Sequence, residues 1–124
     1  MERGGAKLCD YRCGSIWLVN FDPSIGTEIG KTRPALIISP TDFNQVRSKV
    51  TLLPISSTII RAKKIVPVVI RVPASAENGL NNESTVIAIE PSTFDKRRLV
   101  KHLGQIESHF FTEVKSILKL YLDL

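Results

Sequence analysis

Several common classes of protein are excluded by what the sequence lacks. It has no GxxxxGK[ST] loop, no GxGxxG stretch, no HExxH pair and no CxxC pair. The phosphate-binding, dinucleotide-binding, zinc-protease and thiol-redox sites that such motifs build are therefore not expected. No apolar run is long enough to span a membrane. Charges at Glu2, Arg3 and Lys7 interrupt the start of the chain, which is unlike a signal peptide. These absences favour a soluble cytoplasmic protein.

Cysteine and histidine are scarce, with two of each. Cys9 and Cys13 could pair or bind a metal, but two ligands do not make a zinc site, and no histidine lies near them in the sequence. We interpret them as reduced thiols in a poorly ordered N-terminal extension, residues 1–13. We interpret His102 and His109 as surface or half-buried residues, because nothing in the sequence orients either one. No metal site is therefore expected.

Acidic residues are missing from a long part of the chain. The segment from Phe43 to Ala76 contains none, although it carries Arg47, Lys49, Arg61, Lys63, Lys64 and Arg71. A second basic cluster is formed by Lys96, Arg97, Arg98 and Lys101, and the formal net charge is +5. Such patches attract phosphates or an acidic protein partner. A solvated basic face is the alternative.

The apolar pattern predicts a mainly β protein with one clear helix. Strand-like runs occupy residues 15–21, 35–39, 50–55, 66–72 and 84–90. Polar connections are expected at 40–48 and 56–65, a turn at 77–83, and a short helix or turn at 95–102. Residues 110–121 repeat apolar side chains on one helical face, with Ser108 as the predicted N-cap. Short strands joined by Gly/Pro turns favour a small barrel, in one domain over residues 14–124.

One connection holds more charge than solubility requires. The stretch GTEIGKTRP, residues 26–34, brings Glu28, Lys31 and Arg33 together between two predicted strands. Pro34 favours an extended Arg33, whose planar guanidinium can bind a phosphate with two hydrogen bonds. The alternative is an ion pair of Glu28 with Arg33 or Lys31 that only braces the loop.

Hydroxyl side chains follow another predicted strand. Ser56, Ser57 and Thr58 come directly after the apolar run that ends at Ile55. Three consecutive hydroxyl groups can donate hydrogen bonds to phosphate oxygens. They can equally satisfy the backbone of a turn, which is the commoner arrangement.

Taken in order, these segments resemble the MazF/PemK family of toxins from toxin–antitoxin modules. The run GSIWLVNFDPSIGTEIGKTRPALIIS, residues 14–39, is similar to the start of that family, with matches at Gly14, Trp17, Pro23, Gly26, Glu28, Gly30, Arg33 and Pro34. LLPISS (52–57), NGLNNESTVIAIE (78–90) and STFDKRRLVKHLGQI (92–106) resemble three later segments of the family. The resemblance runs in order from residue 14 to residue 124.

The resemblance implies a fold, an activity and partners. The fold would be a small SH3-like β-barrel with a C-terminal α-helix, assembled as a homodimer. The activity would be sequence-specific cleavage of single-stranded mRNA, without a metal or any other cofactor, by attack of a 2′-OH on the adjacent phosphate. The partner would be a cognate antitoxin whose acidic tail occupies the RNA groove.

The resemblance also implies the site residues. Arg33 matches the catalytic arginine of the family, Ser56 stands at its catalytic threonine position, and Glu28 matches an acidic position in the same site. Glu28 would be the general base, although Arg33 could also donate a proton to the leaving oxygen. By position and charge, further candidates for RNA contacts are Thr27, Lys31, Ser57, Lys63 and Lys64.

Some residues depart from the family pattern. Ile29 stands where glutamine is frequent, and Glu90-Pro91-Ser92 replaces a Gln-Ile-Arg stretch. These changes leave open a weakened toxin fold that binds RNA, or a protein target such as gyrase, without cleavage. The chain ends KLYLDL, without the tryptophan and glycine typical of the related gyrase poisons. A plain RNA-binding barrel is disfavoured because aromatic residues are only 6% of the chain.

Overall fold

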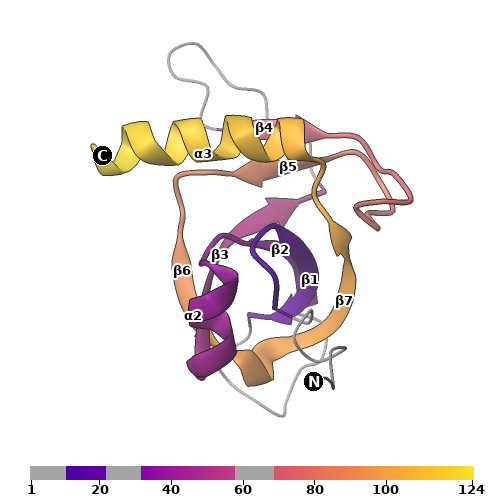
Figure 1. Ribbon diagram of the computed structural model, residues 1–124. Helices are drawn as coiled ribbons and strands as arrows, with labels where there is room; N and C mark the ends of the chain where they lie inside the picture. The colour runs from indigo at the N-terminus through magenta and orange to yellow at the C-terminus, as the bar shows by residue number, and fades with distance from the viewer. Residues whose placement is uncertain (1–10, 22–31, 58–68) are drawn as a thin grey trace.

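Antiparallel strand pairing organises the fold (Figure 1). The computed structural model describes residues 11–21, 32–57 and 69–124. In these ranges the strands are β1 (Ser15–Asn20), β2 (Thr32–Ile37), β3 (Lys49–Ser56), β4 (Val69–Val72), β5 (Ser84–Ile87), β6 (Ser92–Asp95) and β7 (Leu99–Gln105). The helices are α2 (Thr41–Val46), α3 (Ser108–Leu122) and the one-turn 3₁₀ helix η1 (Lys96–Arg98).

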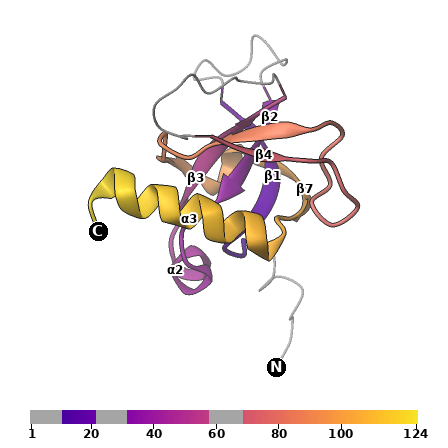
Figure 2. The same cartoon turned by 90° about the horizontal axis from the view of Figure 1, so that it is seen from above.

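The strands form one strongly curled sheet in the order β4-β5-β3-β2-β1-β7, with β6 beside β3. The predicted small SH3-like barrel with a C-terminal helix is confirmed in this barrel-like form. Among the described residues no pairing joins β4 to β7, so the sheet does not close. Figure 1 shows α3 lying across the sheet beside β4 and β5, and Figure 2 shows it beside β4 from above.

Strand β3 changes partner along its length on one side. Residues 49–52 pair with β6, whereas Ile55 and Ser56 pair with β5. Pro54 lies in the gap between these two ladders and pairs with Ala35 of β2 on the other side. A proline suits such a break, because it cannot donate to a ladder. A proline near the end of a strand by itself predicts an edge strand or a bulge. Strand β3 is not an edge strand, because it has partners on both sides.

Two apolar clusters occupy the two faces of the sheet. Ile16, Leu36 and Leu53 belong to the first, which is completed by Val114 and Leu118 of α3. Their strand neighbours point to the opposite face, where a second cluster contains Trp17, Val19, Ala35, Ile37, Val50, Leu52 and Leu99. Because successive side chains alternate between faces, β1, β2 and β3 are buried on both sides. This explains why residues 35–39 read as an uninterrupted apolar run.

Helix α3 agrees with its predicted periodicity but not with its predicted cap. Val114 and Leu118 are buried one turn apart, whereas Tyr121, predicted on the same face, is 55% exposed. Ser108 is the first helical residue, and the N-cap is Glu107, whose side chain makes no capping bond. The prediction of Ser108 as N-cap is therefore wrong by one position. The carboxylate of Glu107 is engaged elsewhere, with Ser75 and Asn78.

Three further predictions need correction. Residues 40–48 contain helix α2, where only a polar connection was expected. Residues 92–105 form β6 and β7 around a three-residue 3₁₀ turn, so the described residues hold seven strands rather than five. Pairing with β1 and β3 decides this, because basic residues favour helices locally but follow a strand when a partner is available. Strand β2 begins at Thr32, so Arg33 lies inside it.

The remaining boundaries differ less. The strand predicted at 84–90 ends at Ile87, and the turn predicted at 77–83 lies in a segment without strand. The first three residues of the strand predicted at 66–72 lie outside the described residues.

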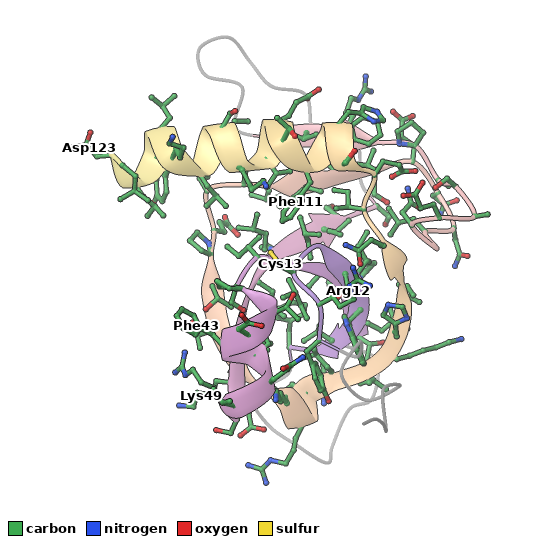
Figure 3. All side chains as sticks on the ribbon, viewed as in Figure 1. Arg12, Cys13, Phe43, Lys49, Phe111 and Asp123 are labelled. Atoms are coloured by element: carbon green, nitrogen blue, oxygen red, sulfur yellow. The ribbon has the colours of Figure 1, made fainter. Side chains whose placement is uncertain are left out.

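Residues 11–13, expected in the N-terminal extension, contact the rest of the protein. The backbone N–H of Cys13 donates to Thr41 Oγ1 at 2.9 Å, and its thiol lies 3.5 Å from the carbonyl oxygen of Ile38 (Figure 3). Cys13 is a free, half-buried thiol. Burial raises the pKa of Cys13, and nearby Lys115 only partly opposes this. These features describe a structural cysteine rather than a reactive one.

Replacing a buried and an exposed leucine tests the packing of the core on the two faces of the sheet. We expect Leu53→Ala, at a fully buried position of β3, to lower the free energy of unfolding by about 2–5 kcal/mol because it leaves a cavity. Leu120→Ala, at a position 73% exposed on α3, should change it by less than about 0.5 kcal/mol. Urea unfolding followed by circular dichroism measures both. Equal effects would contradict the described packing.

Candidate functional site

A groove of about 480 Å³ lies where β1, β2 and β7 meet the segment that follows β4. Its apolar lining includes Leu18, Pro34 and Leu80. Its polar lining comes from the end of β3, the 79–84 segment and β7, through Ser57, Asn81, Asn82, Ser84, Lys101 and His102. A concave site with an apolar base and a few polar groups is typical of ligand binding.

Arg33 and Ser56 lie at neighbouring strand ends beside this groove. The β2–β3 register ends at the pair of Ala35 with Pro54; beyond it Arg33 pairs with Val19 of β1, and Ser56 pairs with Thr85 of β5. Arg33 and Ser56 are not among the residues that line the groove, but their chain neighbours Pro34 and Ser57 are.

Ser56 is positioned by its pairing with β5. Its Cα pairs with Thr85 at the start of β5, and Thr85 Oγ1 donates to the Ser56 carbonyl oxygen at 3.4 Å. Thr85 is fully buried, and its neighbour Ser84 lines the groove. The side chain of Ser56 is half-buried.

The Arg33 side chain is exposed. Within the described ranges its guanidinium makes no hydrogen bond and no ion pair. Its proposed counter-charge, Glu28, lies outside the described residues, so the bracing ion pair stays a hypothesis. A guanidinium in this position offers its donors to an anionic ligand.

The other predicted site residues divide into two groups. Ser57 is exposed and lines the groove. The rest lie outside the described residues, namely Thr27, Glu28, Lys31, Lys63 and Lys64. Of the residues that depart from the family pattern, Glu90 is exposed in the segment between β5 and β6 and is not part of the groove lining.

Sequence reasoning missed the groove residues of the 79–84 segment and of β7. Asn81 and Asn82 were interpreted only as turn chemistry, and Lys101 only as one of a basic cluster. The Cα of Lys101 pairs with that of Leu18, which places both residues beside the groove. Nothing in the sequence of residues 79–84 indicates that they line a groove. Only the resemblance of this segment to the family, in its place along the chain, could have pointed to it.

The two histidines and most of the second basic cluster contact other parts of the protein. His102 is exposed and meets the edge of Trp17 at 5.3 Å between ring centroids, and His109 packs against Phe110. The carboxylate of Asp95 caps η1 by accepting from the backbone N–H of Arg97, and it also accepts from the Arg97 guanidinium. These bonds lower the pKa of Asp95.

Two other members of that cluster are also engaged. Arg98 donates to the carbonyl oxygen of Asn20 at 3.1 Å, and the Lys96 ammonium lies 4.6 Å from the ring centre of Tyr11. Much of this cluster therefore braces the fold. Its charges still contribute to the basic surface.

A buried polar network supports one wall of the groove. Asn78 is fully buried, and its Oδ1 accepts from the backbone N–H groups of Ser75 at 3.1 Å and Leu80 at 3.0 Å. Its Nδ2 donates to the carbonyl oxygen of Pro73 at 2.9 Å and to Glu107 Oε1 at 3.1 Å. Ser75 Oγ donates to Glu107 Oε2 at 2.6 Å. Both polar atoms of Asn78 are thus satisfied, as burial requires.

Two glycines let this wall approach β7 closely. Gly79 has a φ of +73°, and a Cβ there would overlap the carbonyl oxygen of Leu103. A Cβ on Gly104 would overlap the carbonyl oxygen of Glu77. That carbonyl oxygen also accepts from the backbone N–H of Gln105 at 2.9 Å. Only glycine combines this conformation with this proximity at position 79.

The carboxylate of Glu107 is stabilised in its charged form. Burial by itself raises its pKa, but hydrogen bonds from Ser75 and Asn78, helped by His109, outweigh burial and lower the pKa of Glu107 overall. The network therefore depends on an ionised acceptor.

In the part of the chain that is described, no group of three or more His, Cys, Asp or Glu side chains could hold a metal ion. None of the helices there is long and apolar enough to cross a membrane.

Comparisons with known proteins agree with one another. A family model described as "PemK-like, MazF-like toxin of type II toxin-antitoxin system" matches residues 12–122. The endoribonuclease MazF9 of Mycobacterium tuberculosis is 29% identical over 118 residues, covering 91% of this chain and 97% of the relative. Two crystal structures from Deinococcus radiodurans are each 29% identical and cover 91% of this chain and 96% of theirs. MazF has a TM-score of 0.71, and a MazE–MazF structure has 0.72.

The lowered pKa of Glu107 predicts how stability depends on pH. A carboxylate whose pKa falls on folding stabilises the folded state above its unfolded pKa of about 4.3 and loses this effect as the pH falls through the lower folded value. We therefore expect Glu107→Gln to destabilise the protein most near neutral pH and progressively less below about pH 4. Urea unfolding at several pH values measures this, with Glu113→Gln on the exposed side of α3 as control. A pH-independent loss would contradict the assigned role.

Proposed function

Since the chain belongs to the family of PemK-like, MazF-like toxins of type II toxin–antitoxin systems, we propose that it cleaves single-stranded mRNA at the rim of the groove. It is an endoribonuclease, as are the named relatives that match nine-tenths of its length. The observation that supports the proposed site is that Arg33 and Ser56 lie in the paired strands β2 and β3, each next to a residue that lines the groove.

The reaction is an internal transfer within the RNA. The 2′-oxygen attacks the adjacent phosphorus, the bond from phosphorus to the 5′-oxygen breaks, and a cyclic phosphate and a 5′-hydroxyl result. The proton from the 2′-OH must go to a base, and the leaving oxygen must gain a proton. Negative charge grows on the phosphoryl oxygens in the transition state, so fixed donors aimed at them lower the barrier.

Each proposed residue has one of these roles. The Arg33 guanidinium stabilises the phosphoryl oxygens with parallel hydrogen bonds, and Ser56 Oγ adds a third. Glu28 takes the 2′-proton as general base, and the cations of Lys31 and Arg33, close to it in the sequence, would favour its ionised form. Arg33 is a poor general acid, because a guanidinium does not give up its proton in proteins. Serine at position 56 keeps the hydroxyl of the family's threonine but lacks the methyl group that restricts its rotamer.

The groove itself holds the RNA next to the scissile phosphate. Leu18, Pro34 and Leu80 offer an apolar surface to a base, and Lys101 offers a cation to a phosphate. Ser57 can donate a hydrogen bond to the same strand. Thr27, Lys31, Lys63 and Lys64 are proposed as additional RNA contacts. Which sequence is cut depends on these groups together.

We propose two protein partners. The first is a second copy of this chain, forming a homodimer, and the second is a cognate antitoxin with an acidic tail. The net charge of +5 suits an acidic partner, and a MazE–MazF structure is known for the Deinococcus radiodurans relative. The toxin would act in the cytoplasm, where mRNA is translated.

Cleavage in the presence of EDTA tests the proposed chemistry. The wild-type protein should cut a long single-stranded RNA into discrete fragments that carry 5′-hydroxyl ends. Arg33→Ala should lower the cleavage rate by about 100-fold or more, because a transition-state donor is lost. Ser56→Ala should also be impaired, whereas Ser56→Thr should remain active. Arg47→Ala, at an exposed position outside the groove lining, is the matched control.

The outcomes separate the alternatives. If the wild type leaves several RNAs of diverse sequence intact, the nuclease proposal is wrong and a binding module remains. If Arg33→Ala retains full activity, the assigned site is wrong.

The proposed homodimer is tested by sedimentation of the purified protein. We expect a mass near twice that of the 13.8 kDa chain at micromolar concentration. A single species at the mass of one chain under these conditions would refute the dimer.

A further inference from the structure

One wall of the groove depends on a carboxylate that does not line it. We propose that Glu107, acting through Asn78, is a positioning residue for RNA binding: it holds the 79–84 wall of the groove in place against β7. This rests on the proposed function, since the ligand of the groove is taken to be RNA. Glu107 lies at the junction of β7 and α3 and is not among the groove residues.

The first step is the way in which Asn78 is fixed. Its Oδ1 binds the backbone on both sides, at Ser75 and Leu80, while its Nδ2 reaches Pro73 and Glu107. An amide held on both atoms cannot rotate without breaking at least two bonds in a buried site. The loop from Pro73 to Leu80 thus closes around one side chain, and Glu107 is the partner of that side chain from outside the loop.

The second step leads from Asn78 into the groove. The next two residues, Gly79 and Leu80, line it, and Leu80 also packs into the apolar cluster beneath α3. Gly79 touches the backbone of Leu103, which lines the groove from β7. A shift of Asn78 would therefore move Leu80 and widen the groove at its junction with β7.

The third step explains why the side chain at position 107 is a carboxylate. Glu107 accepts from the Ser75 hydroxyl and from the Asn78 amide, and both of its oxygens are used. A carboxylate accepts at both oxygens, so every donor is satisfied. Glutamine keeps one acceptor, and the Ser75 hydroxyl can rotate to accept from its amide. Alanine leaves the Asn78 amide with one hydrogen bond fewer in a buried position.

Electrostatics alone predicts the opposite effect on RNA binding. Removing a negative charge from a protein that binds RNA strengthens its attraction to phosphates and lowers KM. If Glu107 positions the wall, removing it raises KM in spite of this. The sign of the change therefore distinguishes positioning from a general charge effect.

The experiment compares Glu107→Ala, Glu107→Gln and Glu113→Ala. Glu113 lies on the same helix, is exposed and has the same charge, so its variant measures the charge effect alone. Cleavage of a fluorophore–quencher single-stranded RNA gives KM and kcat at a temperature where circular dichroism shows each variant folded. We expect Glu107→Ala to raise KM about tenfold with kcat within about twofold, a loss of uniform binding. Glu107→Gln should show a smaller rise, and Glu113→Ala should show none.

Destabilisation alone would give a different pattern. A partly unfolded variant has less active protein, so kcat falls and KM does not change. An unchanged KM, or a fall in kcat only, would overturn the proposal. If Glu107→Ala does not fold, Glu107→Gln and Ser75→Ala, which each weaken the network less, carry the same test.

Failure of the nuclease proposal can be told apart from failure of this one. If the wild type does not cut, fluorescence anisotropy with the same RNA still measures binding. A dissociation constant raised about tenfold in Glu107→Ala relative to wild type and Glu113→Ala would support positioning without catalysis. An unchanged dissociation constant, or no RNA binding by the wild type, would overturn the inference.

Discussion

The structure depends on the pairing of strand β3 with three partners. It lies beside β2 along one side and beside β6 and then β5 along the other. Pro54 lies between the ladder with β6 and the ladder with β5. The sheet curls, and both faces of its central strands are buried. Helix α3 covers one face, and the curl encloses the other.

The same pairing brings the candidate site together. Because β3 ends at Ser56 and β2 begins just before Arg33, the antiparallel pairing of these strands places both residues near the same end of the pair. The groove beside them is built differently, since its walls come from segments that are distant in the chain and joined by buried polar groups. Backbone ladders therefore place the strands that carry Arg33 and Ser56, whereas buried side chains such as Asn78 and Glu107 join the segments beside the groove.

The sequence predicted an element correctly where its residue pattern has only one physical cause. The two-sided burial of residues 35–37 and the apolar face of α3 could be read directly, because period and hydrophobicity reflect burial. The strands β6 and β7 could not, since Lys96–Lys101 has a composition that also suits a helix or turn. The N-cap moved from Ser108 to Glu107 because the chain enters the helix one residue earlier than the apolar pattern indicated.

By itself the sequence determined the family, the mainly β fold with a C-terminal helix, and the residue types of the proposed chemistry. Ordered motifs and apolar periodicity are local properties, and they survive in the chain before it folds. Only the tertiary structure decided that the strands of Arg33 and Ser56 pair, that Lys101 and Asn81 line one groove, and that Glu107 accepts a hydrogen bond from Asn78. Each of these relations joins residues that lie about 20 or more positions apart in the sequence. They follow from strand register and buried hydrogen bonds, which exist only after the sheet has curled.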